Sequence, residues 1–248
     1  MSFVSSIRHF IILSILVCKI ADTVFKPIND TLLKQRQFVS DASHELRTPI
    51  TVISANADVL GNLIDNKYLD SIKSQTERLN LLVSDLLTLS KMDEGKLSIP
   101  KERFSLSQLI NALVLPFEAV AFEKGKFLYL DNQNDIDYFG DSESVKLLVN
   151  ILIDNAIKHS TKNATIKVSL KKDGTKILLE VYNDGSNIFD QDSDKVFERF
   201  YKGDKSRKHT DSGSGLGLCI AKNICDNNKW KITAKSKLNE SFTITVIM

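Results

Sequence analysis

Residues 38–60 read FVSDASHELRTPITVISANADVL and determine the architecture of the N-terminal half of the chain. Their apolar side chains recur at spacings of three and four residues. At about 100° per residue such spacings form one narrow stripe along an α-helix. The stripe consists of Val39, Ala42, Leu46, Ile50, Ile53, Ala57 and Leu60. His44 falls nearly opposite the stripe, so we expect an exposed imidazole on the outer face of this helix.

A second helical stripe follows a turn signal between residues 61 and 66. Its members alternate by three and four residues, which is a heptad pattern: Leu69, Ile72, Thr76, Leu79, Val83, Leu86 and Ser90. Two such helices form an antiparallel hairpin, and a lone hairpin leaves apolar surface in water. A homodimer that forms a four-helix bundle would bury this surface. An intramolecular coiled coil without catalytic chemistry is not excluded by the stripes.

The N-terminus, residues 7–25, reads IRHFIILSILVCKIADTVF and departs from a soluble pattern. Its apolar run, residues 10–18 with Ser14 inside it, is shorter than the roughly 20 residues that span a bilayer core. A secretory signal fits poorly because Lys19 and Asp22 interrupt a cleavage site, and a lipoprotein signal fits less well still. A buried soluble helix is a further alternative. We predict that residues 1–27 are a partial transmembrane or membrane-proximal helix, with the catalytic part of the chain in the cytoplasm.

Downstream of the heptads the pattern changes to alternating helices and strands. We place the helical hairpin at residues 28–93, a linker at 94–102 and a second domain at 103–248. The second domain is predicted to contain helices over 105–124, 142–159 and 216–225, strands over 127–130, 165–170, 177–182, 230–234 and 242–247, and a loop over 184–214. Asp173-Gly174 is a hairpin signal. The predicted class is α+β: a helical hairpin followed by an α/β sandwich with a mixed sheet.

The segment around His44 has the composition of a nucleophilic site. A neutral imidazole is a nucleophile when one ring nitrogen carries a free lone pair, and Glu45 can take the proton from the other as a general base. A surface histidine without a role is the alternative. A zinc site of the HExxH kind is excluded, because Thr48 stands where the second histidine would be.

Residues 43–49, SHELRTP, resemble the phosphoacceptor box of the sensor histidine kinases of two-component systems. The resemblance implies a dimerisation and phosphoacceptor domain of the HisKA type, followed by an ATPase domain of the GHKL type. It implies His44 as the phosphorylated residue and Glu45 as its base. It also implies that Thr48 positions a water molecule when the partner regulator is dephosphorylated.

Residues 154–160, DNAIKHS, close a predicted helix and carry groups for a metal ion and for phosphate. Asn155 offers an amide oxygen to Mg²⁺, and Lys158 offers a cation to phosphate. The resemblance adds His159 to the ATP-binding residues. The family usually has a second asparagine four residues before the metal ligand, where this chain has Ile151. A purely structural hydrogen-bonding role for Asn155 is the alternative.

Residues 181–188, VYNDGSNI, resemble the first glycine box of the family. The family usually has an aspartate two residues before the glycine, and its carboxylate accepts a hydrogen bond from the adenine amino group. Asn183 occupies that position here, and an amide oxygen also accepts such a bond. Asp184 and Gly185 complete the ATP-binding residues expected from this box. By itself the segment is only a turn signal.

Two further segments resemble the ATP lid and the second glycine box. In residues 196–202, VFERFYK, two aromatic side chains can fasten a loop while Arg199 and Lys202 approach phosphates; a solvated basic loop is the alternative. Residues 212–218, SGSGLGL, open a predicted helix, and glycines there let backbone N–H groups approach phosphate oxygens. The ATP-binding residues expected here are Gly213, Gly215, Leu216, Gly217 and Leu218.

These motifs predict a sensor histidine kinase that phosphorylates itself on His44 from Mg-ATP. The phosphoryl group would pass to an aspartate of a response regulator, which the chain would also dephosphorylate. The expected cofactors are ATP and Mg²⁺. The expected partners are a second copy of the chain, the regulator and, through the N-terminal helix, the cell membrane. Nucleic acid is not expected, because the net charge is only +2 and no basic block occurs.

Two other functions compete with this interpretation. A docking protein or phosphatase that keeps the fold but turns over little ATP is suggested by Ile151 and Asn183. Another member of the wider ATPase superfamily, such as a gyrase-like or chaperone-like ATP clamp, would leave the His44 segment without a purpose.

Overall fold

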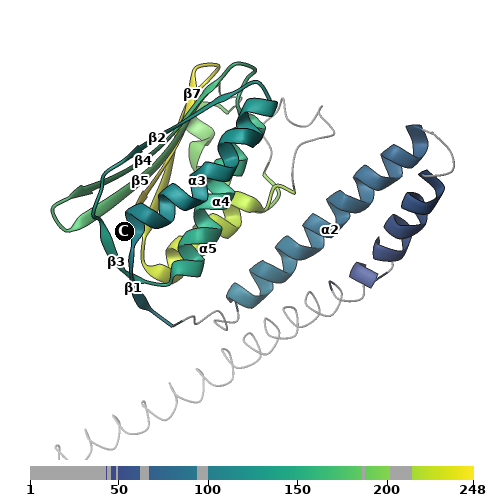
Figure 1. Cartoon of the computed structure of the whole chain (residues 1–248), viewed down its shortest axis with the longest axis horizontal. Coiled ribbons are helices and arrows are strands. Elements are labelled where there is room, and N and C mark those ends of the chain that lie inside the picture. Colours follow the sequence, from purple (N-terminus) through teal and green to yellow (C-terminus); the bar gives the residue numbers. More distant parts are fainter. Residues whose placement is uncertain are drawn as a thin grey trace, which may run out of the picture.

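The computed structural model describes residues 43, 46–48, 50–61, 67–93, 100–185, 188–201 and 214–248. These residues form a helical part and an α/β lobe (Figure 1). Both predicted parts of the fold are therefore confirmed, and the sheet of the lobe is mixed as expected.

The helical part is an antiparallel hairpin, in which the helix over residues 50–61 runs beside α2 (Lys67–Asp93) (Figure 1). Ile50 packs with Val83 and Leu87 in a buried cluster between the two helices. An ion pair of 3.1 Å between Lys73 and Asp58 joins them near the turn. The predicted hairpin thus forms within a single chain.

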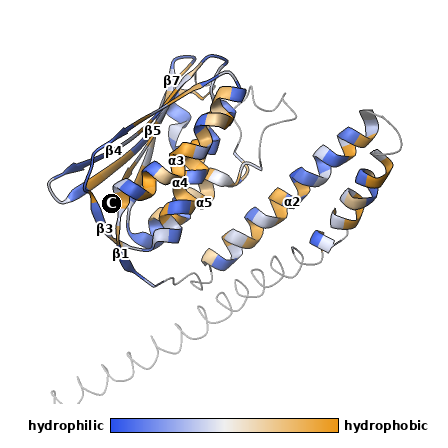
Figure 2. Cartoon of the chain, viewed as in Figure 1, coloured by the Kyte–Doolittle hydropathy of each residue, from blue (hydrophilic) through white to orange (hydrophobic). Residues whose placement is uncertain are grey.

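Only part of each predicted stripe is buried in the hairpin. Ile50, Ala57 and Val83 are buried. A second set of stripe residues, spaced seven apart on each helix, is between 43% and 51% exposed: Leu46, Ile53 and Leu60, and then Ile72 and Leu79. Both helices of the hairpin show hydrophobic and hydrophilic stretches along their length (Figure 2). The hairpin therefore leaves a row of large apolar side chains uncovered on each helix.

The lobe is built on a five-stranded sheet with the order β2-β4-β5-β7-β6. Its strands are β2 (Phe127–Asn132), β4 (Thr165–Asp173), β5 (Lys176–Asp184), β6 (Lys231–Lys237) and β7 (Ser241–Ile247). β2 and β4 are parallel, and the other neighbours are antiparallel. Along β5, buried and partly exposed residues alternate from Ile177 to Asp184, as expected for a strand with one covered face.

Three helices cover one face of this sheet: α3 (Leu106–Glu123), α4 (Ser142–His159) and α5 (Gly217–Asn228) (Figure 1). Helix α4 begins where the Asp141 carboxylate accepts hydrogen bonds from the amides of Glu143 and Ser144, at 2.9 and 3.1 Å, which is an N-cap. Helix α3 is apolar and long enough to cross a membrane by composition, yet it buries Ile110 and Val114 in the core of the lobe.

Three elements of the lobe were not predicted. Strands β1 (Glu102–Ser105) and β3 (Asp137–Gly140) form a separate antiparallel pair, so the predicted linker ends in a strand. The 3₁₀ helix η1 (Asp190–Phe197) lies within the predicted loop over 184–214. The loop prediction was wrong there, because a short 3₁₀ helix of mostly polar residues shows no helical stripe.

The hairpin packs against the lobe through the C-terminal half of α2. Leu89 and Met92 belong to the core of the lobe, and Leu82 and Leu86 pack against that core while partly buried. Helix α5 is an element of the lobe that α2 contacts. The two parts of the chain therefore share an apolar interface.

Candidate active site

Four segments of the lobe converge on the candidate site. They are the C-terminal end of α4, the end of β5, the chain after η1 and the start of α5. Gly185, after β5, lies against Thr161, after α4. The amide of Phe200 donates to the carbonyl of Gly215 at 2.9 Å. Segments distant in sequence, which carry most of the predicted ATP-binding residues, are therefore neighbours in the structure.

Asn155 lies near the C-terminal end of α4 with its side chain half-buried. No hydrogen bond to its amide group is found among the described residues, although its helix neighbours Ile153 and Ala156 are buried in the core. Within the described ranges its carbonyl oxygen thus has no hydrogen-bonding partner and can accept a ligand.

Ile151 stands where the family has its second asparagine. Its Cγ2 atom lies 3.6 Å from the position that a Cβ atom on Gly217 would take. Ile151 thus fills the contact between α4 and α5, in keeping with its place against the core of the lobe. This side chain supplies packing and has no oxygen for a metal ion.

Lys158 extends from the same end of α4 and forms an ion pair of 2.6 Å with Asp154, one turn earlier. Its side chain is 35% exposed, so the ammonium group faces solvent at the edge of the site. His159 is also exposed in this last turn. To bind an anion such as a phosphate, Lys158 must either leave the Asp154 carboxylate or contact both groups at once.

Asn183 is almost fully buried, at 2% exposed. Its Nδ2 group donates to the carbonyl oxygens of Asp184 and Gly185, at 3.1 and 3.0 Å. These two acceptors fix the orientation of the amide, because its nitrogen must face them. Within the described part of the chain no donor contacts the opposite atom, Oδ1, which remains available as an acceptor.

Asp184 lies on the other face of β5 from Asn183, as alternation along a strand requires. Its two carboxylate oxygens accept hydrogen bonds of 2.7 Å from the Thr165 amide and from the Tyr182 hydroxyl. Burial acts to raise the pKa of Asp184, but these hydrogen bonds outweigh it and hold the pKa below its usual value. The structure therefore does not bring Asp184 to the side of the sheet that Asn183 faces.

Gly185 has a backbone φ of 76°, which few residues other than glycine adopt. A Cβ atom at this position would lie 2.5 Å from Cγ2 of Thr161. Glycine is thus required both by the turn and by the close approach of the chain that leaves α4. This contact holds the chain after β5 against the chain that leaves α4.

The start of α5 is held by the chain that follows η1. Gly215 has a φ of 74°, and a Cβ atom there would lie 3.1 Å from Cα of Phe200. Leu216 is fully buried and anchors the turn, and its amide donates to Oγ of Ser214 at 3.1 Å. Gly217 and Leu218 then open α5, where helical N–H groups lack helical acceptors.

Two further predicted site residues are exposed, and four lie outside the described residues. Arg199 is exposed directly before Phe200. Thr48 is exposed on the first helix of the hairpin. The predictions for His44, Glu45, Lys202 and Gly213 lie outside the described residues.

Two contacts at the site were not predicted from the sequence. Ser214 Oγ donates to the Asp85 carboxylate of α2 at 2.6 Å, across 129 residues of sequence. Lys126 is 8% exposed, and its Nζ group donates to the carbonyls of Ile157 and Ser160 at the end of α4. No local sequence signal marks either contact, because both depend on tertiary packing.

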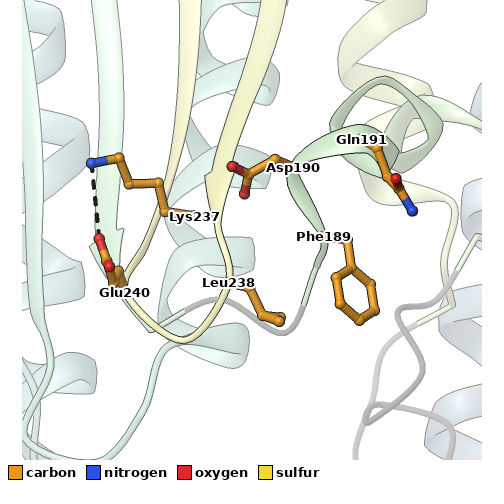
Figure 3. Close-up of a pocket in the computed structure, with 6 residues that line it drawn as sticks. All are labelled: Phe189, Asp190, Gln191, Lys237, Leu238 and Glu240. Atoms are coloured by element: carbon orange, nitrogen blue, oxygen red, sulfur yellow. Dashed lines mark ion pairs between the residues drawn. The ribbon is translucent and has the colours of Figure 1, made fainter.

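A separate open pocket of about 560 Å³ lies between η1 and the β6–β7 turn (Figure 3). Its lining residues are Phe189, Asp190, Gln191, Lys237, Leu238 and Glu240. It includes none of the predicted site residues. Within the described ranges no cluster of three or more His, Cys, Asp or Glu side chains is arranged to hold a metal ion.

Two family models match the chain in sequence. Residues 34–95 match the His Kinase A (phospho-acceptor) domain, and residues 140–248 match the histidine kinase-, DNA gyrase B- and HSP90-like ATPase. The first match includes His44, and the second includes every residue predicted here to bind ATP.

Known proteins resemble the chain over most of its length. The sensor protein DltS of Streptococcus agalactiae (serotype V) is 37% identical over 233 residues, which are 93% of this chain and 58% of DltS. The signal transduction histidine-protein kinase ArlS of Staphylococcus aureus (strain USA300) is 33% identical, over 89% of this chain and 50% of ArlS. The chain thus spans little more than half the length of these relatives. Full-length ShkA, solved with AMPPNP, shares the fold with a TM-score of 0.70 and 18% identity, over 85% of this chain and 45% of ShkA.

Proposed function

Because this chain belongs to the sensor histidine kinases of two-component systems, we propose that it phosphorylates itself on His44 with ATP bound in its α/β lobe. The phosphoryl group then passes to an aspartate of a response regulator. The observation that carries the proposal is the convergence of Asn155, Lys158, Asn183 and the start of α5 on one edge of a lobe that follows a phosphoacceptor hairpin.

The orientation of the nucleotide follows from the two ends of the site. Asn183 presents a fixed acceptor oxygen, which suits the exocyclic amino group of adenine. Lys158 and the backbone N–H groups of Gly217 and Leu218 suit the phosphates. ShkA, which shares the fold, was solved in complex with AMPPNP, and this supports a nucleotide as the ligand.

We assign the Mg²⁺ that would accompany ATP to Asn155. A hard cation takes oxygen ligands, and Mg²⁺ commonly keeps several waters while it binds one or two protein groups and substrate phosphates. The half-buried amide of Asn155, without a described hydrogen-bonding partner, fits that role. Since Ile151 has no oxygen to contribute, Asn155 is the protein ligand we expect from α4. When bound, Mg²⁺ supplies charge neutralisation at the phosphates.

The transfer step uses one ring nitrogen of His44 as the nucleophile. Its lone pair forms the P–N bond as the bond between the γ-phosphorus and the bridging oxygen breaks, which releases ADP. Glu45 accepts the proton from the other ring nitrogen, so that the phosphoimidazole is left neutral at the ring. In the second step a regulator aspartate takes the phosphoryl group, and the imidazole regains a proton.

Incubation of the full chain with γ-labelled ATP and Mg²⁺ tests this proposal. We expect a label that acid removes and base does not, and we expect His44→Gln to abolish it. Asn155→Ala should abolish the label while the oligomeric state stays unchanged. A label that persists in His44→Gln would place the phosphoryl group on another residue and overturn the assignment.

We propose a homodimer through the uncovered rows of the hairpin. The exposed positions Leu46, Ile53 and Leu60 on one helix and Ile72 and Leu79 on the other have heptad spacing, and a second hairpin would complete a four-helix bundle. Analytical ultracentrifugation of Ile53→Glu against the exposed control Thr51→Glu tests this. The first substitution should yield monomers and the second should not.

We further propose that Thr48 takes part in dephosphorylating the regulator. It lies exposed on the hairpin helix, one turn beyond His44. Thr48→Ala should retain the label on His44 and slow the loss of phosphate from the regulator. Loss of both activities together would contradict separate roles for the two residues.

We propose that residues 1–27 attach the chain to the cell membrane, with the lobe in the cytoplasm. The support is the apolar run of the sequence, which lies outside the described residues. Membrane fractionation of the full chain and of a chain that starts at residue 28 tests the attachment. Equal distribution of both between membrane and soluble fractions would refute it.

A second candidate is a protein that dephosphorylates a regulator and turns over little ATP. The packing of Ile151 against Gly217 favours it, because the family's second metal contact is replaced by an apolar one. The labelling experiment separates the two candidates. Absence of label with retained regulator dephosphorylation would support the second.

A further inference from the structure

The contact between Asp85 and Ser214 joins the hairpin to the candidate nucleotide site. Ser214 Oγ donates to Asp85 at 2.6 Å and accepts from the Leu216 amide at 3.1 Å. The carboxylate of α2 is therefore tied, through one hydroxyl group, to the turn that opens α5. This turn belongs to the glycine segment that we assign to the phosphates.

The surroundings of Asp85 are charged and partly shielded from water. Burial raises the pKa of Asp85, the Ser214 hydrogen bond and the charge of Lys158 lower it, and the charge of Asp154 raises it again, with a net rise. Asp85 thus lies within electrostatic range of the Lys158–Asp154 pair. A negative charge from the hairpin stands near the cation assigned to phosphate.

Apolar contacts hold the same interface together independently of the hydrogen bond. Leu89 and Met92, which follow Asp85 on α2, are buried in the core of the lobe. Leu82 and Leu86, on either side of Asp85, pack against that core. The charge of Asp85 can therefore be removed while most of the docking surface is kept.

We propose that the Asp85–Ser214 hydrogen bond is an autoinhibitory latch that docks the lobe on α2 and opposes nucleotide binding. The docked carboxylate and a bound triphosphate repel each other, because both are negative and both approach Lys158 and the turn before α5. Nucleotide binding then favours release of the lobe from α2, and docking in turn weakens nucleotide binding by the same factor. The inference rests on the proposed function, since it requires nucleotide phosphates at this site.

Nucleotide titration of the full chain, with a fluorescent ATP analogue and Mg²⁺, tests the latch. Asp85→Asn removes the charge and keeps the shape, and we expect about three- to tenfold tighter binding, a modest electrostatic coupling. Asp85→Ala, which also removes the hydrogen bond, should bind at least as tightly as Asp85→Asn. Glu77→Gln is the matched control: it removes an exposed carboxylate two turns away on the same helix and should change affinity less than twofold.

Hydrogen exchange of the unaltered chain gives a second measurement that needs no variant. Addition of AMPPNP and Mg²⁺ should speed exchange in residues 82–92, because the docked face of α2 is released. Wild-type protein that binds no nucleotide would refute the proposed function itself. Wild-type binding with no gain in Asp85→Asn and Asp85→Ala beyond that of Glu77→Gln, or unchanged or slower exchange in residues 82–92, would refute the latch alone.

Discussion

Replacement of Gly185 by alanine should separate two costs that the structure combines at one residue. The backbone φ of 76° disfavours an L side chain by about 1–2 kcal/mol. The added Cβ atom would also lie 2.5 Å from Cγ2 of Thr161, and such overpacking costs about 1–3 kcal/mol. We therefore expect Gly185→Ala to lower the free energy of unfolding by about 2–5 kcal/mol.

Gly174 provides a matched control for the backbone cost. Its φ is 59°, and a Cβ atom there would meet nothing within 4 Å. Gly174→Ala should therefore lower the free energy of unfolding by only about 1–2 kcal/mol. The clash can be relieved by Thr161→Ala, which removes the methyl group that the new Cβ would meet. The double variant should then recover about 1–3 kcal/mol relative to the sum of the single losses.

Urea unfolding of the four variants measures these differences, and nucleotide titration of the same samples connects them to function. Gly185 accepts a hydrogen bond from Asn183 and lies against Thr161, after α4, so Gly185→Ala should weaken nucleotide binding while Gly174→Ala leaves it unchanged. Equal destabilisation by the two alanines would refute the reasoning. A double variant of Gly185→Ala and Thr161→Ala would also refute it if its loss in the free energy of unfolding equalled the sum of the two single losses.

Three further outcomes follow from single side chains. Asp184→Asn should lower the free energy of unfolding by about 1 kcal/mol at pH 7. Because the folded pKa of Asp184 lies below its ordinary value, this stabilisation should fade as pH falls through the folded pKa. Urea midpoints of both chains from pH 7 to pH 3 check this, and a difference between them that does not change with pH would contradict it. Lys126→Met should lower the free energy of unfolding by about 1–3 kcal/mol, because two carbonyls at the end of α4 lose a charged donor. An unchanged urea midpoint would contradict a stabilising role for these hydrogen bonds. Burial raises the pKa of the Cys225 thiol to about 12. A disulfide reagent at pH 8 should therefore spare Cys225 in the native chain and modify it in urea. Equal modification rates in the two conditions would show that the thiol is accessible in the native chain.

Periodic segments of the lobe could be predicted because burial imposes their pattern. In α4 the buried residues recur at helical spacing from Val145 to Ile157, and in β4 and β5 they alternate. Strand β1 could not be found in this way, since four residues, ERFS, hold too little pattern to distinguish a strand from a linker. Its partner β3 is equally short.

The site was predictable as a set of residues but not as an arrangement. Alternation along β5 places Asn183 and Asp184 on opposite faces, and this signal was available in the sequence because the strand itself was predicted. The link between Asp85 and Ser214 had no such signal. It depends on how α2 docks on α5, and 129 residues separate the two side chains.

The position of β7 has a consequence for how the lobe is made in the cell. It pairs with β5 on one side and β6 on the other, yet it follows both in the chain. A ribosome must therefore synthesise residues 241–247 before the sheet can join β6 to the earlier strands. Until then the edge of β5 stays open to other polypeptides, so the nascent lobe should depend on chaperones more than a lobe whose middle strands are translated first.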